Sequence, residues 1–258
     1  MFIGKMDTPA IPERVYALCK IVEKGPISNS DLKEKMEPAF LDQSTVYYSF
    51  YRKAAEELKL ISISDQMISL QVDKKVLVSF ESFRKYVNSI LHEYSEGDFY
   101  TVTKAYYAWD NTVFKGAKNV SVMAKEMTEI CERNIDAVGM RAWRFWVSFL
   151  GFGYLQDMFF IPNADVFLTD IIEISKLEKG RRYSFGDFIE KIKPYCQVVL
   201  NNENMRYLNY GFSCGLRTLH DQGKIKMEHI LDNKDIWSLY PMKAHQLVSI
   251  VTNITINE

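Results

Sequence analysis

The sequence has few of the residues that build metal centres, disulfide frameworks and phosphate-binding loops. Its 258 residues include four cysteines and four histidines, and neither type shows metal-ligand spacing or a C-x-x-C pair. We therefore expect buried free thiols, no metal and no cofactor. The glycines at 180, 211 and 215 are not followed by the G-K-[ST] of a P-loop, and no pair of carboxylates stands out. These absences predict a protein that is not an enzyme.

Long apolar runs are also missing. The longest apolar stretch, "AWRFWVSFLGFGYL", is interrupted by Arg144 and is too short to span a bilayer. The N-terminus, "MFIGKMDTPAIPERVY", lacks the apolar segment of a signal peptide. Because 47% hydrophobic and 25% charged residues are ordinary for a globular protein, we expect a soluble, cytoplasmic chain without membrane contact.

A basic excess is absent as well. The formal net charge is −1, residues 1–80 carry 11 Lys/Arg and 11 Asp/Glu, and residues 170–258 carry 12 and 11. Proteins that bind nucleic acid gain most of their affinity by neutralising phosphates. The charge balance therefore weighs against DNA binding.

The N-terminal segment shows a clear series of elements. A first amphipathic helix begins at Pro12 and stops at Gly25-Pro26. Ser28 or Ser30 caps a short second helix, and Ser44 caps a longer third one, "STVYYSFYRKAAEELK". Next, "LISIS" and "MISLQV" alternate apolar and polar residues on either side of "DQ", which predicts a β-hairpin.

The third predicted helix has two apolar stripes that compete for the core. One consists of Tyr48, Tyr51, Ala55 and Leu58, and the other of Val46, Phe50 and Ala54. Three helices followed by a hairpin resemble the winged helix-turn-helix family over about residues 11–73. The resemblance implies that the third helix enters the major groove of DNA while the hairpin, or wing, touches the backbone.

The residues Gly211 to Gly215 fit the G-x-S-x-G pattern of a hydrolase nucleophile elbow. An elbow requires a buried apolar strand before its serine, and the preceding "NNENMRYLNY" is polar and helix-like. We therefore expect Ser213 to lie within a helix. A hydrolase remains the alternative, which predicts a strand before Gly211 and loss of activity in Ser213→Ala.

The same region fits a second winged-helix pattern at about residues 170–245. Ser184 caps a helix in "RRYSFGDFIEKIKPYC", and "ENMRYLNYGFSCGLRTLHDQG" reads as a long helix that ends at Gly223. "KIKMEHI" and "IWSLYP" then predict a second hairpin.

The middle of the chain is helical and rich in aromatic residues. Helices are expected around 81–94, 99–109 and 121–133, followed by an apolar helix that ends at Gly151 or Gly153, a truncated wing in "YLQDMFFIP" and a new helix from "ADVFLTDII". This order is compatible with a degenerate third winged helix. The aromatic stripe of Trp143, Phe145, Trp146 and Phe149 predicts a core or a subunit interface, such as that of a homodimer, rather than a platform for bases.

A further resemblance concerns "RFWVSFLGFGYLQDMFFIPNADVFLTDII" after an N-terminal winged helix. These residues resemble the DpdG-like proteins of bacterial DNA-modification and phage-defence islands in their aromatic, L-G-x-G and I/V-P pattern. Asn163-Ala164 departs from the Asp-Pro-Thr expected there. The resemblance covers about thirty residues and implies an accessory, non-catalytic part in a defence system.

The candidate DNA-binding residues lie on both predicted winged helices. In the first they are Ser44, Thr45, Tyr47, Ser49, Arg52 and Lys53 of the third helix and Gln66 of the wing. In the last they are Arg181 and Arg182 of the "KGRR" turn, Arg206, Lys224 and Lys226. Hydroxyl groups and lysine suit phosphates, and the arginine fork suits guanine. A solvated helix face explains the first set equally well.

We accordingly predict a mostly α protein with small β-hairpins, built of tandem winged-helix modules joined by a helical middle region. The predicted domains are 1–78, 79–168 and 169–258. The favoured function is non-catalytic DNA binding in a bacterial DNA-handling or phage-defence system. The alternative is a protein-interaction subunit similar to the kite subunits of chromosome-condensing complexes, which grip a protein partner, and the near-neutral charge favours it.

Overall fold

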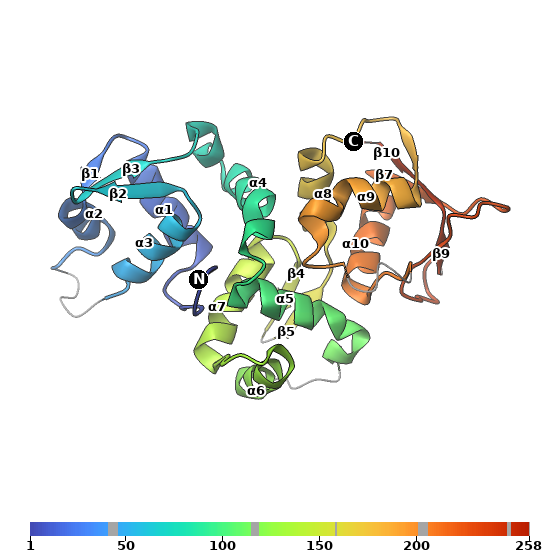
Figure 1. The fold of residues 1–258 in the computed structure, drawn as a ribbon, viewed down its shortest axis with the longest axis horizontal. Helices are drawn as coiled ribbons and strands as arrows, with labels where there is room; N and C mark the ends of the chain where they lie inside the picture. Colours follow the sequence, from blue (N-terminus) through green and yellow to red (C-terminus); the bar gives the residue numbers. More distant parts are fainter. Residues whose placement is uncertain (41–45, 115–118, 158, 201–205, 247–248, 258) are drawn as a thin grey trace.

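The computed structural model describes residues 1–40, 46–114, 119–157, 159–200, 206–246 and 249–257. These residues form α-helices and short antiparallel sheets, as the sequence predicts for a mostly α protein with small hairpins. Three units follow one another in Figure 1: an N-terminal unit (α1 to β3), a middle unit (α5 to β5) and a C-terminal unit (α8 to β10). No described helix is long and apolar enough to cross a membrane.

The N-terminal unit has three helices and a three-stranded sheet. Its elements are α1 (Pro12–Val22), β1 (Ile27–Ser28), α2 (Asn29–Met36), α3 (Tyr48–Glu57), β2 (Ile61–Ser64) and β3 (Met67–Leu70). The strand order is β1-β3-β2. Ser28 caps α2 by accepting from the Asp31 N–H at 3.0 Å, which resolves the choice between Ser28 and Ser30. Asp65 and Gln66 join β2 to β3 with positive φ, as in a tight hairpin turn.

Helix α3 is shorter than predicted. It begins at Tyr48 rather than after a Ser44 cap, and Ser44 and Thr45 lie outside the described residues. The stripe of Tyr48, Tyr51, Ala55 and Leu58 is buried, as is Ala54, whereas Val46 of the competing stripe is 65% exposed. Phe50 of the competing stripe is half-buried, so α3 packs on α1 mainly through the face that carries Tyr48 and Tyr51.

A connector and the middle unit follow. The connector consists of the 3-10 helix η1 (Lys74–Leu77), α4 (Phe80–Ile90) and the 3-10 helix η2 (Leu91–Tyr94). The middle unit consists of α5 (Asp98–Ala108), η3 (Asp110–Phe114), α6 (Val120–Cys131), α7 (Ala137–Phe149), β4 (Gly153–Gln156) and β5 (Phe159–Pro162). Strands β4 and β5 pair antiparallel, which confirms the predicted hairpin in "YLQDMFFIP".

The C-terminal unit repeats the order of the N-terminal one, with an added pair of strands. Its elements are α8 (Asp165–Ile174), β6 (Arg182–Ser184), α9 (Phe185–Cys196), α10 (Tyr210–Asp221), β7 (Ile225–Glu228), β8 (Trp237–Ser238), β9 (Ile250–Val251) and β10 (Asn253–Ile256). The main sheet has the order β6-β10-β7, so the last strand is again central. Helix α8 crosses the predicted boundary between residues 168 and 169.

Two predictions for the C-terminal unit are wrong. The expected hairpin of "KIKMEHI" with "IWSLYP" does not form, because β7 pairs with β10 while β8 pairs with β9. Buried Ile225 and Met227 match buried Ile256 and Ile254 across this ladder, which aligns the apolar faces of both strands. Helix α10 starts at Tyr210 instead of near residue 203, because Asn209 caps it by accepting from the Phe212 N–H at 2.9 Å.

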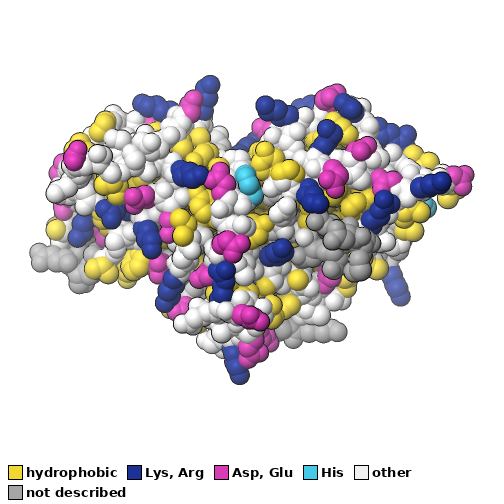
Figure 2. Space-filling model, in the orientation of Figure 1, with side chains coloured by type: hydrophobic (Ala, Val, Ile, Leu, Met, Phe, Trp, Pro, Cys, Tyr) yellow, Lys and Arg dark blue, Asp and Glu magenta, His cyan; other side chains and the backbone are white. Residues whose placement is uncertain are grey.

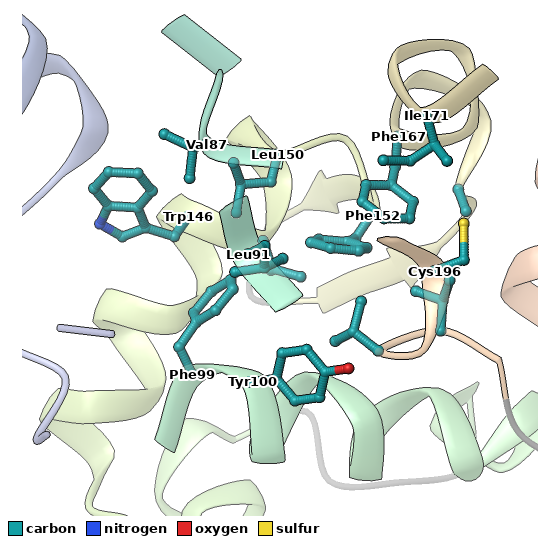
Figure 3. Packing of buried hydrophobic residues seen from close by; sticks show 14 of the residues in the cluster. Val87, Leu91, Phe99, Tyr100, Trp146, Leu150, Phe152, Phe167, Ile171 and Cys196 are labelled. Carbon is teal, nitrogen blue, oxygen red and sulfur yellow. The ribbon is translucent and has the colours of Figure 1, made fainter. Parts of the chain in front are cut away.

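One hydrophobic core runs through all three units. Figure 3 shows Val87 of α4, Phe99 of α5 and Trp146 of α7 in a layer with Phe167 of α8. Trp146 also donates a 2.5 Å hydrogen bond to the Ala10 carbonyl and packs edge-on against Phe2, so the N-terminal arm belongs to this core. The units are thus held together by buried apolar contact.

Candidate nucleic-acid interface

Helix α3 turns one face to the core and leaves its first turn open. Tyr48 and Tyr51 are 5% and 1% exposed, while Ser49 and Lys53 lie on the exposed side. The Ser49 hydroxyl donates to the Val46 carbonyl at 2.9 Å, which satisfies a backbone oxygen at the helix start. The predicted contacts Ser49 and Lys53, four residues apart, therefore share one solvent-facing surface, whereas the Tyr47 ring lies 5.5 Å from the Arg14 guanidinium of α1.

Arg52 has a structural bond that the sequence does not reveal. Its guanidinium donates to Asn29 Oδ1 at 2.9 Å, and the Tyr48 hydroxyl donates to the same oxygen at 3.0 Å. Asn29 is the first residue of α2, so the two bonds tie α3 to α2. The Arg52 Nε is buried without a hydrogen-bond partner. To read a guanine, Arg52 has to leave Asn29.

Burial changes the chemistry of the two tyrosines beneath this surface. It raises the pKa of Tyr48 to about 12. It also raises the pKa of Tyr51 well above its usual range, with a further contribution from the 2.9 Å hydrogen bond that Tyr51 donates to Glu37. Both phenols therefore stay protonated and serve as neutral donors between α2 and α3.

The other candidate residues of the N-terminal unit, Lys53 and Gln66, both interact with neighbouring residues. Lys53 lies 3.9 Å from Glu57 on the next turn, which screens part of its charge. Gln66 is exposed at the hairpin turn, and its carbonyl accepts from the Asn29 N–H at 2.9 Å. That bond fixes the tip of the hairpin beside the start of α2.

Apolar side chains are exposed at the same end of the unit. Phe40 is 83%, Val46 65%, Tyr47 44% and Met67 40% exposed. They lie after α2, before α3 and at the start of β3. A surface that meets phosphates is usually polar and basic, so these side chains favour contact with a protein.

Most of the predicted basic residues of the C-terminal unit are paired with carboxylates. Arg181 pairs with Glu178 at 2.6 Å, and Arg182 and Lys226 share Glu228 at 3.1 and 2.8 Å. Arg206 is not on a helix but on an exposed bend, where it pairs with Asp235 at 3.3 Å. Lys224 lines a separate cavity described below. Charge pairing therefore reduces the attraction of these cations for phosphate.

Helix α10 is buried along most of its length. Eight of its twelve residues are buried, and it packs against α8 and β5. A Cβ on Gly211 would come within 2.6 Å of the Tyr107 ring, and one on Gly215 within 2.7 Å of the Ala164 carbonyl carbon. The two glycines of the G-x-S-x-G pattern thus permit close packing.

Ser213 lies inside this helix, as predicted, and its hydroxyl is fully occupied. It donates to the Leu208 carbonyl at 3.1 Å and accepts from the Tyr240 N–H at 2.8 Å, with no exposed area. His220 accepts from the Met227 N–H at 3.1 Å, and His245 pairs with Asp221 at 3.0 Å. The serine therefore has the environment of a structural hydroxyl, and the strand that an elbow requires does not precede it among residues 206–210.

The aromatic stripe of α7 is largely internal. Trp143 and Trp146 are fully buried, and the Trp143 indole donates to the Thr103 hydroxyl at 2.9 Å. Their assignment to an interface is therefore corrected, because the chain's own core covers them. Phe145 is 44% exposed, and Phe149 is half-buried against Phe80 with ring centroids 4.4 Å apart.

In the described part of the chain, no group of three or more His, Cys, Asp or Glu side chains is placed to hold a metal ion. Three of the cysteines are buried free thiols, and Cys131 is half-buried. Comparison with protein-family models, with curated proteins and with solved structures gave no match to this chain.

Proposed function

We propose that this chain is a non-catalytic winged-helix protein that binds DNA through its N-terminal unit, as an accessory component of a bacterial DNA-handling or phage-defence system. The order helix, strand, helix, helix, strand, strand with the last strand central supports the winged-helix assignment. In that architecture α3 enters the major groove and the β2–β3 hairpin lies on the backbone.

The observation that carries the proposal is the exposure of Ser49 in the first turn of α3 and of Lys53 in the next turn. Helix α10 holds the same place in the C-terminal unit, yet it is covered by α8 and β5, so it has no face left for a groove. Helix α3 exposes Ser49 and Lys53, Tyr47 is exposed just before the helix, and the Gln66 carbonyl of the hairpin accepts from the Asn29 N–H at the start of α2. With so few cations the affinity rests on a small number of phosphate contacts and depends only modestly on salt.

The test is fluorescence anisotropy of the purified protein with labelled duplex and single-stranded DNA across a salt series. We compare the parent with a Lys53→Ala, Gln66→Gly variant, because glycine keeps the positive φ of residue 66. The expected result is duplex binding that the variant weakens about tenfold, with a salt slope lower by about 1. Lys104→Ala is the matched control, since this exposed lysine lies on α5 and belongs to neither set of candidate DNA-binding residues.

A second candidate function is a protein-interaction subunit, favoured by the exposed Phe40, Val46 and Met67. It predicts no DNA binding even at low salt, together with self-association in sedimentation equilibrium that a Val46→Gln, Met67→Gln variant abolishes. DNA binding that the Lys53→Ala, Gln66→Gly variant and the Lys104→Ala control weaken equally contradicts both functions proposed for the α3 surface.

A further inference from the structure

A cavity lies where the connector helix α4 meets the C-terminal unit. Its volume is about 470 Å³, within the range of about 300 to 1,000 Å³ of small-molecule sites. Helices α4 and α8 form two of its walls, and the rest is formed by the segment between α8 and β6, the end of α10, the start of β7 and the end of β10. Figure 2 shows the molecule notched along its upper edge, between the N-terminal unit with the connector and the C-terminal unit.

The inner wall of the cavity is aliphatic. Ile172, Leu177, Leu219 and Ile225 line it and are at most 9% exposed. The Thr169 hydroxyl on this wall is occupied by a 2.9 Å hydrogen bond that it donates to the Asp165 carbonyl. The wall therefore accepts hydrocarbon and offers little to a polar group.

The rim carries three lysines and two glutamates. Lys85 is neutralised within the rim, because it lies 3.1 Å from Glu81 and 2.6 Å from Glu173. Lys179 and Lys224 have no carboxylate within 4.0 Å among the residues that the structure describes, and Lys224 acts on Glu81 only over a longer distance. Three lysines against two glutamates leave the cavity with a positive excess of one charge. Lysine ammonium groups are strong partners for carboxylate and phosphate.

The C-terminal strand holds the two lysines in place. The Gly180 N–H, next to Lys179, donates to the Ile256 carbonyl at 2.6 Å, and the Asn257 N–H donates to the Lys224 carbonyl at 2.8 Å. Both turns are thus anchored on the end of β10, with their side chains at the mouth of the cavity.

We propose that this cavity binds a small amphiphilic anion, whose hydrocarbon body packs on the aliphatic wall and whose carboxylate or phosphate head lies between Lys179 and Lys224. The bound molecule contacts both α4 and the C-terminal unit and stabilises their arrangement by mass action. The inference does not depend on DNA binding.

The test is a fluorescence titration with 8-anilinonaphthalene-1-sulfonate, an amphiphilic anion that emits strongly in apolar sites. We expect one site per chain, displaced by octanoate or octyl phosphate but not by octanol or inorganic phosphate at equal concentration. The more effective of the two octyl anions identifies the head group.

A Lys179→Gln, Lys224→Gln variant separates a specific site from general dye binding. Its affinity for the dye should fall about tenfold or more, as expected for lost charge-assisted hydrogen bonds, while circular dichroism stays that of the parent. The matched control is Lys234→Gln, Lys243→Gln, which removes two exposed lysines outside the cavity. Dye binding at several sites, binding that both variants share with the parent, or displacement by octanol overturns the proposal.

Discussion

Single residues hold close contacts between neighbouring helices within a unit. Gly215 of α10 faces the Ala164–Asp165 backbone at the start of α8, where no larger residue fits without moving main chain. Asn29 accepts from both Tyr48 and Arg52, so one amide oxygen joins α2 to α3. The sequence could not indicate the partner of Gly215, because Gly215 and Ala164 are 51 residues apart in the chain.

The replacement Gly215→Ala tests this packing. Alanine is the better helix former, yet its Cβ would lie 2.7 Å from the Ala164 carbonyl carbon, so the free energy of unfolding should fall by about 1 to 3 kcal/mol. Chemical denaturation measures the change. Gly4→Ala is the control, because nothing lies within 4 Å of its added Cβ, and should stay within about 0.5 kcal/mol. A Gly215→Ala protein as stable as the parent contradicts the packing argument.

At the scale of elements, α4 and α8 are joined by a buried polar network. Arg84 donates through two nitrogens to Asp170 at 2.8 and 2.9 Å, and Asn88 donates to the same carboxylate at 2.9 Å. Asp170 is fully buried, and its hydrogen bond with Arg84 raises the pKa of that guanidinium. In a sequence, a charged residue on the apolar face of a predicted helix indicates a buried ion pair. The sequence does not show which residue is its partner.

The replacement Asp170→Asn should destabilise the protein strongly. It leaves the half-buried Arg84 guanidinium with only the exposed Glu81, 3.9 Å away, as a counter-charge, a change that costs about 3 kcal/mol. Glu173→Gln is the control one turn further along α8, because it breaks the more exposed ion pair with Lys85 and should cost less than about 1 kcal/mol. Thermal unfolding of both variants measures the difference, and equal losses would show that the network does not join the helices.

Helices α3 and α10 show that neighbouring elements decide whether a helix is exposed and can contact a partner. Both precede the final two strands of their sheets, and both were predicted to expose a contact face. Helix α3 exposes Tyr47 before its first turn, whereas α10 is covered by β5 and α8. The helical pattern of each could be predicted from local spacing. The burial of α10 could not, because it depends on the β4–β5 hairpin, about fifty residues away in the chain.

The whole molecule is unified by its continuous core. Phe2 packs on Trp146 of the middle unit, and the N-terminal ammonium pairs with Glu57 at 2.7 Å. Figure 3 shows how α4, α5, α7 and α8 contribute to one layer. The units therefore behave as parts of one body although their topology repeats.

This continuity predicts cooperative unfolding. Chains of this length commonly unfold in separate domain transitions, but here the buried surface is shared, so urea unfolding followed by tryptophan fluorescence should coincide with unfolding followed by far-UV circular dichroism. Asp170→Asn, which loosens the joint, should separate the two curves. Non-coincident curves in the parent would show that the units are independent.

The sequence by itself determined the local elements of this protein. The Pro12 start, the Ser28 and Ser184 caps, the "DQ" turn and the helical position of Ser213 all follow from the preferences of neighbouring residues. The tertiary structure alone decided the pairing of β7 with β10, the burial of Trp143 and Trp146, and the tie between Arg52 and Asn29. These features join residues that are far apart in the chain. They depend on which apolar and charged faces pack together in the core, and the local spacing of residues does not determine this.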